Sequence, residues 1–87
     1  MATKKEVLEA YWNDFLNSAT KQQLFDFANQ GDRDAQFKVG ENFYYGENGF
    51  KENEERAITW YQKAASQGHE GVIERLYEIE QWRNEEN

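Results

Sequence analysis

The 87-residue sequence contains neither cysteine nor proline. Without cysteine the chain has no disulfide framework and no thiolate metal site, and a reducing compartment fits this composition. Without proline, the turn signals are glycine and small polar residues, which cluster at 17–20, 30–32, 46–53 and 67–71. These clusters divide the chain into five segments.

Long apolar runs are also absent. No window approaches the roughly 20 apolar residues of a membrane span. The N-terminal stretch MATKKEVLEA has two lysines but lacks the apolar run of a secretion signal. We therefore expect a soluble, cytoplasmic protein that does not bind membranes.

Basic residues are few: ten lysines and arginines stand against 17 acidic residues, and the net charge is −7. Because affinity for phosphate rests on Lys and Arg, this balance argues against direct binding of nucleic acid. Two interpretations stay open. The charge keeps a small domain soluble, or it meets a protein partner with a basic surface.

Residues for catalysis are scarce. His69 is the only histidine, and Ser18 and Ser66 are the only serines, both at expected helix ends. No nucleophile is therefore paired with a base, and His69 is expected in a solvated turn or at a helix N-cap. Carboxylates recur every four residues at Glu70, Glu74 and Glu78, a pattern more typical of a solvated face than of a cation site. We predict no enzyme activity, no cofactor and no metal.

The apolar residues recur with helical spacing, and no segment alternates with a period of two. We expect an all-α fold of five helices in antiparallel pairs, forming one domain over residues 1–87. The first helix is expected at Lys4–Leu16. Thr3 and Glu6, then Thr20 and Gln23, have the spacing of capping boxes. The stripes expected in the core of the first and fifth helices are Val7, Leu8, Tyr11, Trp12, Phe15 and Leu16, then Val72, Ile73, Leu76 and Tyr77, with Ile79 and Trp82 as further candidates.

Small residues beside large ones predict close helix packing. The segment ERAITWYQKAASQG places three alanines among Ile58, Trp60 and Tyr61. Gly40 lies in the middle of the third expected helix, where glycine costs about 1 kcal/mol relative to alanine. We therefore expect a neighbouring group to approach the backbone at Gly40.

An internal repeat links these features. An offset of 37 residues aligns Ala28, Asn29, Gln30 and Gly31 with Ala65, Ser66, Gln67 and Gly68. A period of this size is typical of a helical array. Residues 31–68 resemble a Sel1-like repeat, a relative of the tetratricopeptide repeat. The matching positions are Gly31, Ala35, Gln36, Phe37, Gly40, Phe43, Gly46, Ala57, Trp60, Tyr61, Lys63, Ala64, Ala65, Gln67 and Gly68. The resemblance implies a short α-α superhelix that serves as a protein-interaction scaffold, with residues 69–87 as a capping helix and acidic tail.

The resemblance also implies a concave face built from the first helix of each pair, here the first, third and fifth segments. Five large aromatic residues fall on these segments: Tyr11, Trp12, Tyr44, Tyr45 and Trp82. They are candidate partner-binding residues, although Trp12, Tyr44 and Trp82 have core positions as an alternative. Tyr45 is the one most expected to be exposed. Glu70, Glu74 and Glu78 form a second, acidic candidate surface.

Two functions follow from these features. The first is a small acidic adaptor, a monomer or weak homo-oligomer that binds a protein partner. The alternative is an acidic inhibitor of bacterial or phage origin, similar to an immunity protein or an anti-CRISPR protein, that binds a basic nucleic-acid-handling target.

Overall fold

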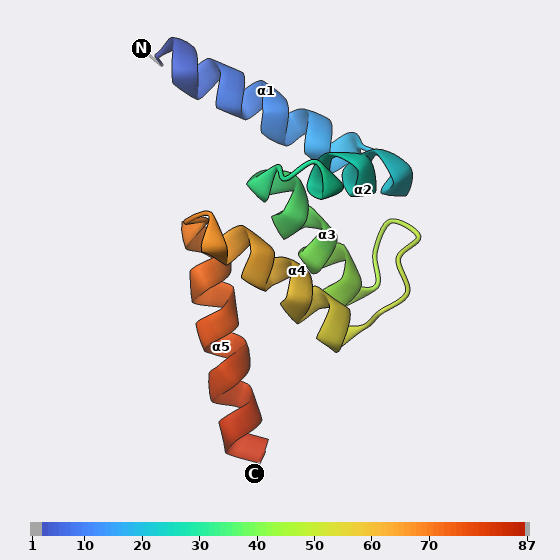
Figure 1. Ribbon diagram of the computed structural model, residues 1–87, viewed down its shortest axis with the longest axis vertical. Helices are drawn as coiled ribbons and strands as arrows, with labels where there is room; N and C mark the ends of the chain where they lie inside the picture. Colours follow the sequence, from blue (N-terminus) through green and yellow to red (C-terminus); the bar gives the residue numbers. More distant parts are fainter. Residues whose placement is uncertain (1–2, 87) are drawn as a thin grey trace.

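The computed structural model describes residues 3–86, with side chains through residue 83. This part of the chain forms five α-helices and no strand (Figure 1). The helices are α1 Lys4–Ser18, α2 Lys21–Asn29, α3 Arg33–Tyr45, α4 Glu54–Ser66 and α5 Glu70–Glu86. The predicted all-α fold is confirmed. The side chains of the acidic tail, Glu85 and Glu86, lie outside the described part.

Side-chain caps define where the helices begin. Thr3 and Thr20 form the predicted capping boxes with Glu6 and Gln23. Asp32 caps α3, and its Oδ1 accepts a hydrogen bond of 2.8 Å from the Ala35 N–H. Each cap satisfies N–H groups that the helix itself leaves free.

The α3 and α4 pair forms the centre of the fold. The Tyr61 side chain is completely buried and lies against Gly40. A Cβ atom on Gly40 would approach Tyr61 Cδ1 to 2.5 Å, so the expected close approach is confirmed. Trp60, in contrast, is only partly buried, and Lys63 Nζ lies 4.2 Å from the centre of its ring. Tyr61 is therefore the core ring of α4.

The core continues from this pair to α2 and to the loop between α3 and α4. Phe50 of that loop is 3% exposed, and its ring lies 5.1 Å from Phe25 of α2 and 5.0 Å from Phe43 of α3. These contacts hold the loop against α2, although the loop contains no proline.

Polar contacts connect the turns that end α2 and α4. The Gln67 amide donates hydrogen bonds of 2.8 Å to the Gly31 carbonyl and 2.9 Å to Gln36 Oε1. Gln36 in turn donates to the Ala28 carbonyl at 3.2 Å. Because Gly31 and Gly68 are 37 residues apart, these bonds join equivalent turns of the repeat.

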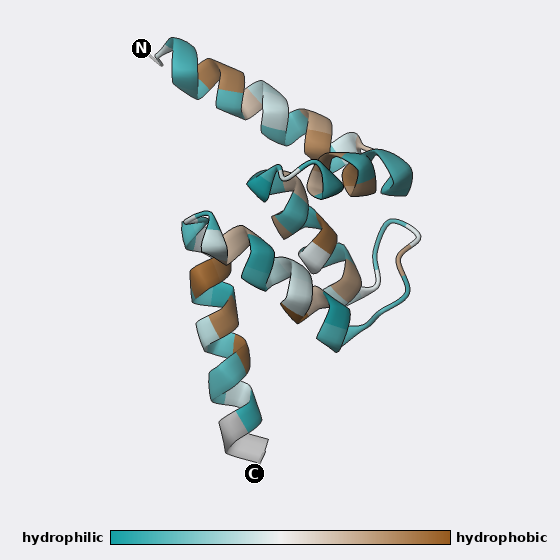
Figure 2. Ribbon diagram, in the orientation of Figure 1, coloured by the Kyte–Doolittle hydropathy of each residue, from teal (hydrophilic) through white to brown (hydrophobic). Residues whose placement is uncertain are grey.

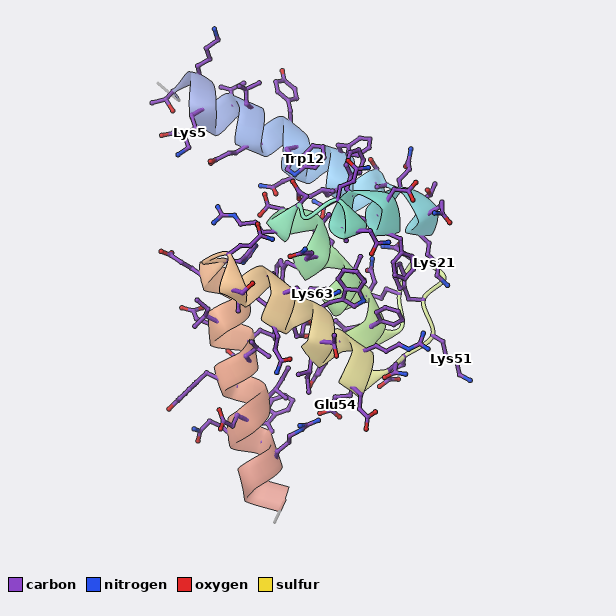
Figure 3. All side chains as sticks on the ribbon, in the orientation of Figure 1. Lys5, Trp12, Lys21, Lys51, Glu54 and Lys63 are labelled. Atoms are coloured by element: carbon purple, nitrogen blue, oxygen red, sulfur yellow. The ribbon has the colours of Figure 1, made fainter. Side chains whose placement is uncertain are left out.

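The prediction that the apolar stripe of α1 lies in the core is largely wrong. Leu16 is buried and Trp12 is half-buried, with its ring 5.1 Å from Phe27 of α2 (Figure 3). The remaining four are exposed: Val7, Leu8, Tyr11 and Phe15. α2 has 9 residues against the 15 of α1, so the N-terminal half of α1 extends beyond α2 (Figures 1 and 2).

The expected core face of α5 is also only partly correct. Val72 and Ile79 are buried, but Ile73 is 50% exposed and Tyr77 is 64% exposed. Within the described residues no further helix follows α5 to cover them (Figure 1). Trp82 is 61% exposed, so its alternative assignment to the core is wrong.

Candidate interaction surface

A groove runs between α1 and α3. It consists of two adjoining hollows that share Leu16 and Asn17 of α1 and Phe37 and Lys38 of α3. One hollow extends to His69 at the start of α5, and the other extends to Tyr45 at the end of α3. The groove therefore lies between the first helices of two consecutive pairs.

A smaller hollow lies between α3 and α5. Its lining residues are Tyr44, Tyr45, Arg75, Glu78, Ile79 and Trp82. Tyr45 thus lines both this hollow and the groove between α1 and α3. Tyr44 and Tyr45 meet edge to face with ring centres 5.0 Å apart, and Tyr45 is 47% exposed, as expected.

Four predicted site residues meet in this hollow, and four do not. The structure brings together Tyr44, Tyr45, Glu78 and Trp82. Tyr11 and Trp12 lie on α1, outside this hollow and outside the groove, and Glu70 and Glu74 are exposed on α5. Of the three acidic candidates, Glu78 alone therefore lies beside aromatic candidates in this hollow.

Arg75 connects the two helices and was not predicted as a site residue. Its Nη2 lies 3.3 Å from Glu41 Oε1, and its Nη1 lies 3.4 Å from Glu78 Oε2. Its guanidinium lies 5.9 Å from the centre of the Tyr45 ring. Burial lowers the pKa of Arg75, but the Glu41 carboxylate together with Tyr45 and Tyr61 outweighs burial and leaves this pKa raised. Arg75 therefore stays charged beside Tyr45.

The 37-residue offset would have identified Arg75. It aligns Lys38 with Arg75, Glu41 with Glu78, and Tyr45 with Trp82. α3 and α5 thus each carry a cation, a carboxylate and an aromatic ring at positions i, i+3 and i+7. We call Lys38, Glu41 and Tyr45 the α3 triad, and their partners the α5 triad. The α3 triad lines the groove between α1 and α3, and the α5 triad lines the hollow between α3 and α5.

The His69 side chain caps α5 and contacts α3. Its Nδ1 accepts a hydrogen bond of 3.3 Å from the Val72 N–H, so it caps α5. Its Nε2 lies 3.5 Å from Asp34 Oδ1, and its ring lies 4.5 Å from that of Phe37. Of the two expected positions, the N-cap is confirmed. The solvated turn is wrong, because the side chain is 18% exposed.

The serine hydroxyls also bond locally. Ser18 Oγ donates to the Phe15 carbonyl at 3.2 Å, and Ser66 Oγ donates to the Lys63 carbonyl at 2.7 Å. Among the described residues, no group of three histidine, aspartate or glutamate side chains is placed to hold a metal ion. No described helix is both long and apolar enough to cross a membrane.

Comparison with known families identifies one segment of the chain. Residues 33–69 match the model of the Sel1 repeat. The chain contains a Sel1 repeat. The matched segment comprises α3, α4 and the His69 cap, and it overlaps the predicted repeat at 31–68. No curated protein and no solved structure matches the chain.

The Sel1 repeat indicates a module for protein–protein interaction. In this one, Gly40 receives the Tyr61 ring and Gln67 bonds the preceding turn. The repeat thus holds α3 against α4, and it leaves Tyr45 exposed where the groove with α1 and the hollow with α5 meet α3.

Proposed function

We propose that the chain is a non-enzymatic adaptor that binds a protein partner through the side lined by α1, α3 and α5. The observation that carries this proposal is the repetition of the α3 triad in the α5 triad, with Tyr45 shared by two hollows. Aromatic anchors beside charged groups are typical of the residues that dominate binding energy in interfaces.

The charges of the two triads support a polar rim around aromatic anchors. Arg75 pairs with Glu41 and Glu78, so its charge is largely balanced within the chain. Tyr45 and Trp82 are 47% and 61% exposed, and a partner side chain placed between them buries both rings. We expect these two rings to contribute most of the affinity, with the triad charges setting the register.

Affinity purification from the source cell, followed by mass spectrometry, tests this proposal. The bait is the wild-type chain, and the test variant is Tyr45→Ala with Trp82→Ala. Tyr11→Ala is the matched control, because Tyr11 is 69% exposed but lies outside both hollows. We expect a partner that the wild type and control retain and the double variant loses. Equal recovery by all three baits would contradict the proposal.

The second candidate function is the acidic inhibitor of bacterial or phage origin. The net charge of −7 and the exposed carboxylates of Glu70 and Glu74 favour it, because a basic nucleic-acid channel attracts such a surface. Glu78 contributes less, since it already pairs with Arg75. Glu70→Lys with Glu74→Lys and Glu78→Lys is expected to slow association with such a target while preserving the fold. The wild-type on-rate would fall steeply with salt.

Both candidates share the properties inferred from the sequence. We propose a cytoplasmic protein that is a monomer or weak homo-oligomer and that makes no direct contact with nucleic acid. If neither the three lysine substitutions nor the salt concentration changes the association rate, the acidic surface is not the binding site. The two triads then remain the candidate binding surface.

A further inference from the structure

The outer face of α5 is apolar, and no helix within residues 3–86 covers it. The 37-residue offset aligns Ile73 with Gln36 and Tyr77 with Gly40. In α3 these positions are buried, and Gly40 lies directly against Tyr61 of α4. In α5 the corresponding residues are 50% and 64% exposed. Ile73 and Tyr77 thus lie where α5 would receive a second helix of its own.

A neighbouring hollow between α4 and α5 extends this surface. Its lining residues are Ile58, Gln62, Leu76, Ile79, Glu80 and Arg83. Gln62 aligns with Phe25 of α2, whose ring lies 6.1 Å from that of Trp60 on α4. α4 thus contacts Phe25 of α2 and Gly40 of α3. The aligned positions, Gln62 of α4 and Tyr77 of α5, therefore outline a site for one more helix.

The charge around this face is mostly negative. Glu70, Glu74 and Glu80 are exposed on α5. The two arginines of this helix bond elsewhere: Arg75 to Glu41 and Glu78, and Arg83 Nε to Glu54 Oε1 at 3.1 Å. The carboxylates that flank Ile73 and Tyr77 are therefore left without balancing charge from α5. Residues 69–87 hold six glutamates and two arginines, a net charge of −4.

We propose that the outer face of α5, defined by Ile73 and Tyr77, binds an amphipathic helix of a partner protein that carries Lys or Arg beside its apolar stripe. We expect the partner helix to have a small residue opposite Tyr77, because the small and the large residue of this contact exchange helices relative to the α3 and α4 pair. There the first helix has glycine and the second has Tyr61; here the first helix supplies the ring. A basic stripe matches Glu70, Glu74 and Glu80.

A second copy of the chain fits this face poorly. Two α5 helices would bring their acidic flanks together, and like charges oppose such a contact. This inference concerns a different surface from the triads, and it does not depend on the proposed function of the concave side.

The chain itself supplies a probe. The probe is a synthetic peptide of residues 54–68, the segment that covers α3, with Glu54→Lys, Glu55→Lys and Tyr61→Ala. A hydrocarbon staple joins positions 59 and 63, whose side chains are exposed in α4, because a helix this short is marginal in water. One control peptide keeps Tyr61, a second keeps both glutamates, and a third has a scrambled sequence of the same composition.

Fluorescence anisotropy with the full chain measures the affinity of each peptide. We expect the probe to bind about tenfold more tightly than each control peptide. We also expect Ile73→Ala with Tyr77→Ala to weaken probe binding by about tenfold or more. Tyr45→Ala is the matched protein control and is expected to leave the affinity unchanged. Circular dichroism melting shows that each variant keeps its fold.

Several results would overturn the proposal. They are no probe binding at millimolar concentration, equal binding by the Ile73 and Tyr77 variant, equal binding by the scrambled peptide, or loss of binding in Tyr45→Ala, which would place the probe on the concave side. Sedimentation that shows a wild-type dimer, and a monomer for Ile73→Ala with Tyr77→Ala, would assign this face to a second copy.

Discussion

Replacing Gly40 by alanine tests the contact at the centre of the fold. In an ordinary helix interior this change stabilises by about 1 kcal/mol, since alanine loses less backbone entropy than glycine. Here the new Cβ would lie 2.5 Å from Tyr61 Cδ1 and 2.7 Å from Tyr61 Cε1. Carbon atoms normally approach to about 3.5–4.0 Å, so the ring has to move by about 1 Å or more.

The Tyr61 ring has little freedom to move. It is completely buried, and the rings of Phe37 and Tyr44 lie 5.9 and 6.3 Å from it. Overpacking of this kind costs about 1–3 kcal/mol. After subtraction of the helix-propensity gain, we expect Gly40→Ala to lower the free energy of unfolding by ~0–2 kcal/mol. Gly40→Leu is expected to destabilise much more or to prevent folding.

Urea denaturation followed by circular dichroism measures these changes. Tyr61→Leu provides the decisive background, because it removes the ring that the new methyl group meets. There Gly40→Ala is expected to stabilise by about 1 kcal/mol, so the sign of its effect reverses. Ala10→Gly on exposed α1 calibrates the propensity term alone. The reasoning is refuted if Gly40→Ala raises the urea midpoint equally in both backgrounds.

Three further changes are expected to have smaller, distinct effects. Trp60→Ala should cost less than the ~3–5 kcal/mol of a fully buried tryptophan, because its ring is only partly buried; a loss in that range by urea denaturation would contradict this. Thr20→Ala should cost about 1 kcal/mol through loss of the capping box, and an unchanged melting curve would argue against that cap. Burial, and to a lesser degree Glu41, raises the pKa of Tyr61 in the folded chain, so its stability contribution is complete below the ordinary pKa of about 10 and is lost as pH rises above it. Tyr61→Phe should therefore flatten the fall in stability above pH 10 relative to wild type, and an identical fall would assign the pH dependence to other groups.

The parts of the fold that depend on local chemistry were predictable from the sequence. Thr3 and Thr20 form capping boxes because both partners of each cap lie within three residues. Gly40 marks a close approach because glycine inside a helix otherwise destabilises it. The helix boundaries and the repeat follow from such short-range features.

The exposed stripes of α1 and α5 were not predictable in the same way. Val7 and Ile73 have helical spacing, which indicates an apolar face but does not tell whether another helix covers it. Coverage depends on the length of α2 and on the absence of a further helix beside α5 within the described residues. Both are properties of the tertiary arrangement.

The candidate site was partly predictable. Tyr45 was expected to be exposed because its neighbours point elsewhere around the turn, and it is. Arg75 was missed because it was considered as one charge on an acidic helix. Its importance lies in its contacts with Glu41 and Tyr45 of α3, which only the aligned repeat or the structure reveals.

Site-specific photocrosslinking in the source cell tests the central claim most directly. A benzophenone amino acid replaces Tyr45 in one variant and Thr59, on the exposed side of α4, in another. We predict a crosslinked protein partner at position 45 and none at position 59. A partner crosslinked from position 59 but not from position 45 would contradict the claim that the side lined by α1, α3 and α5 is the binding surface.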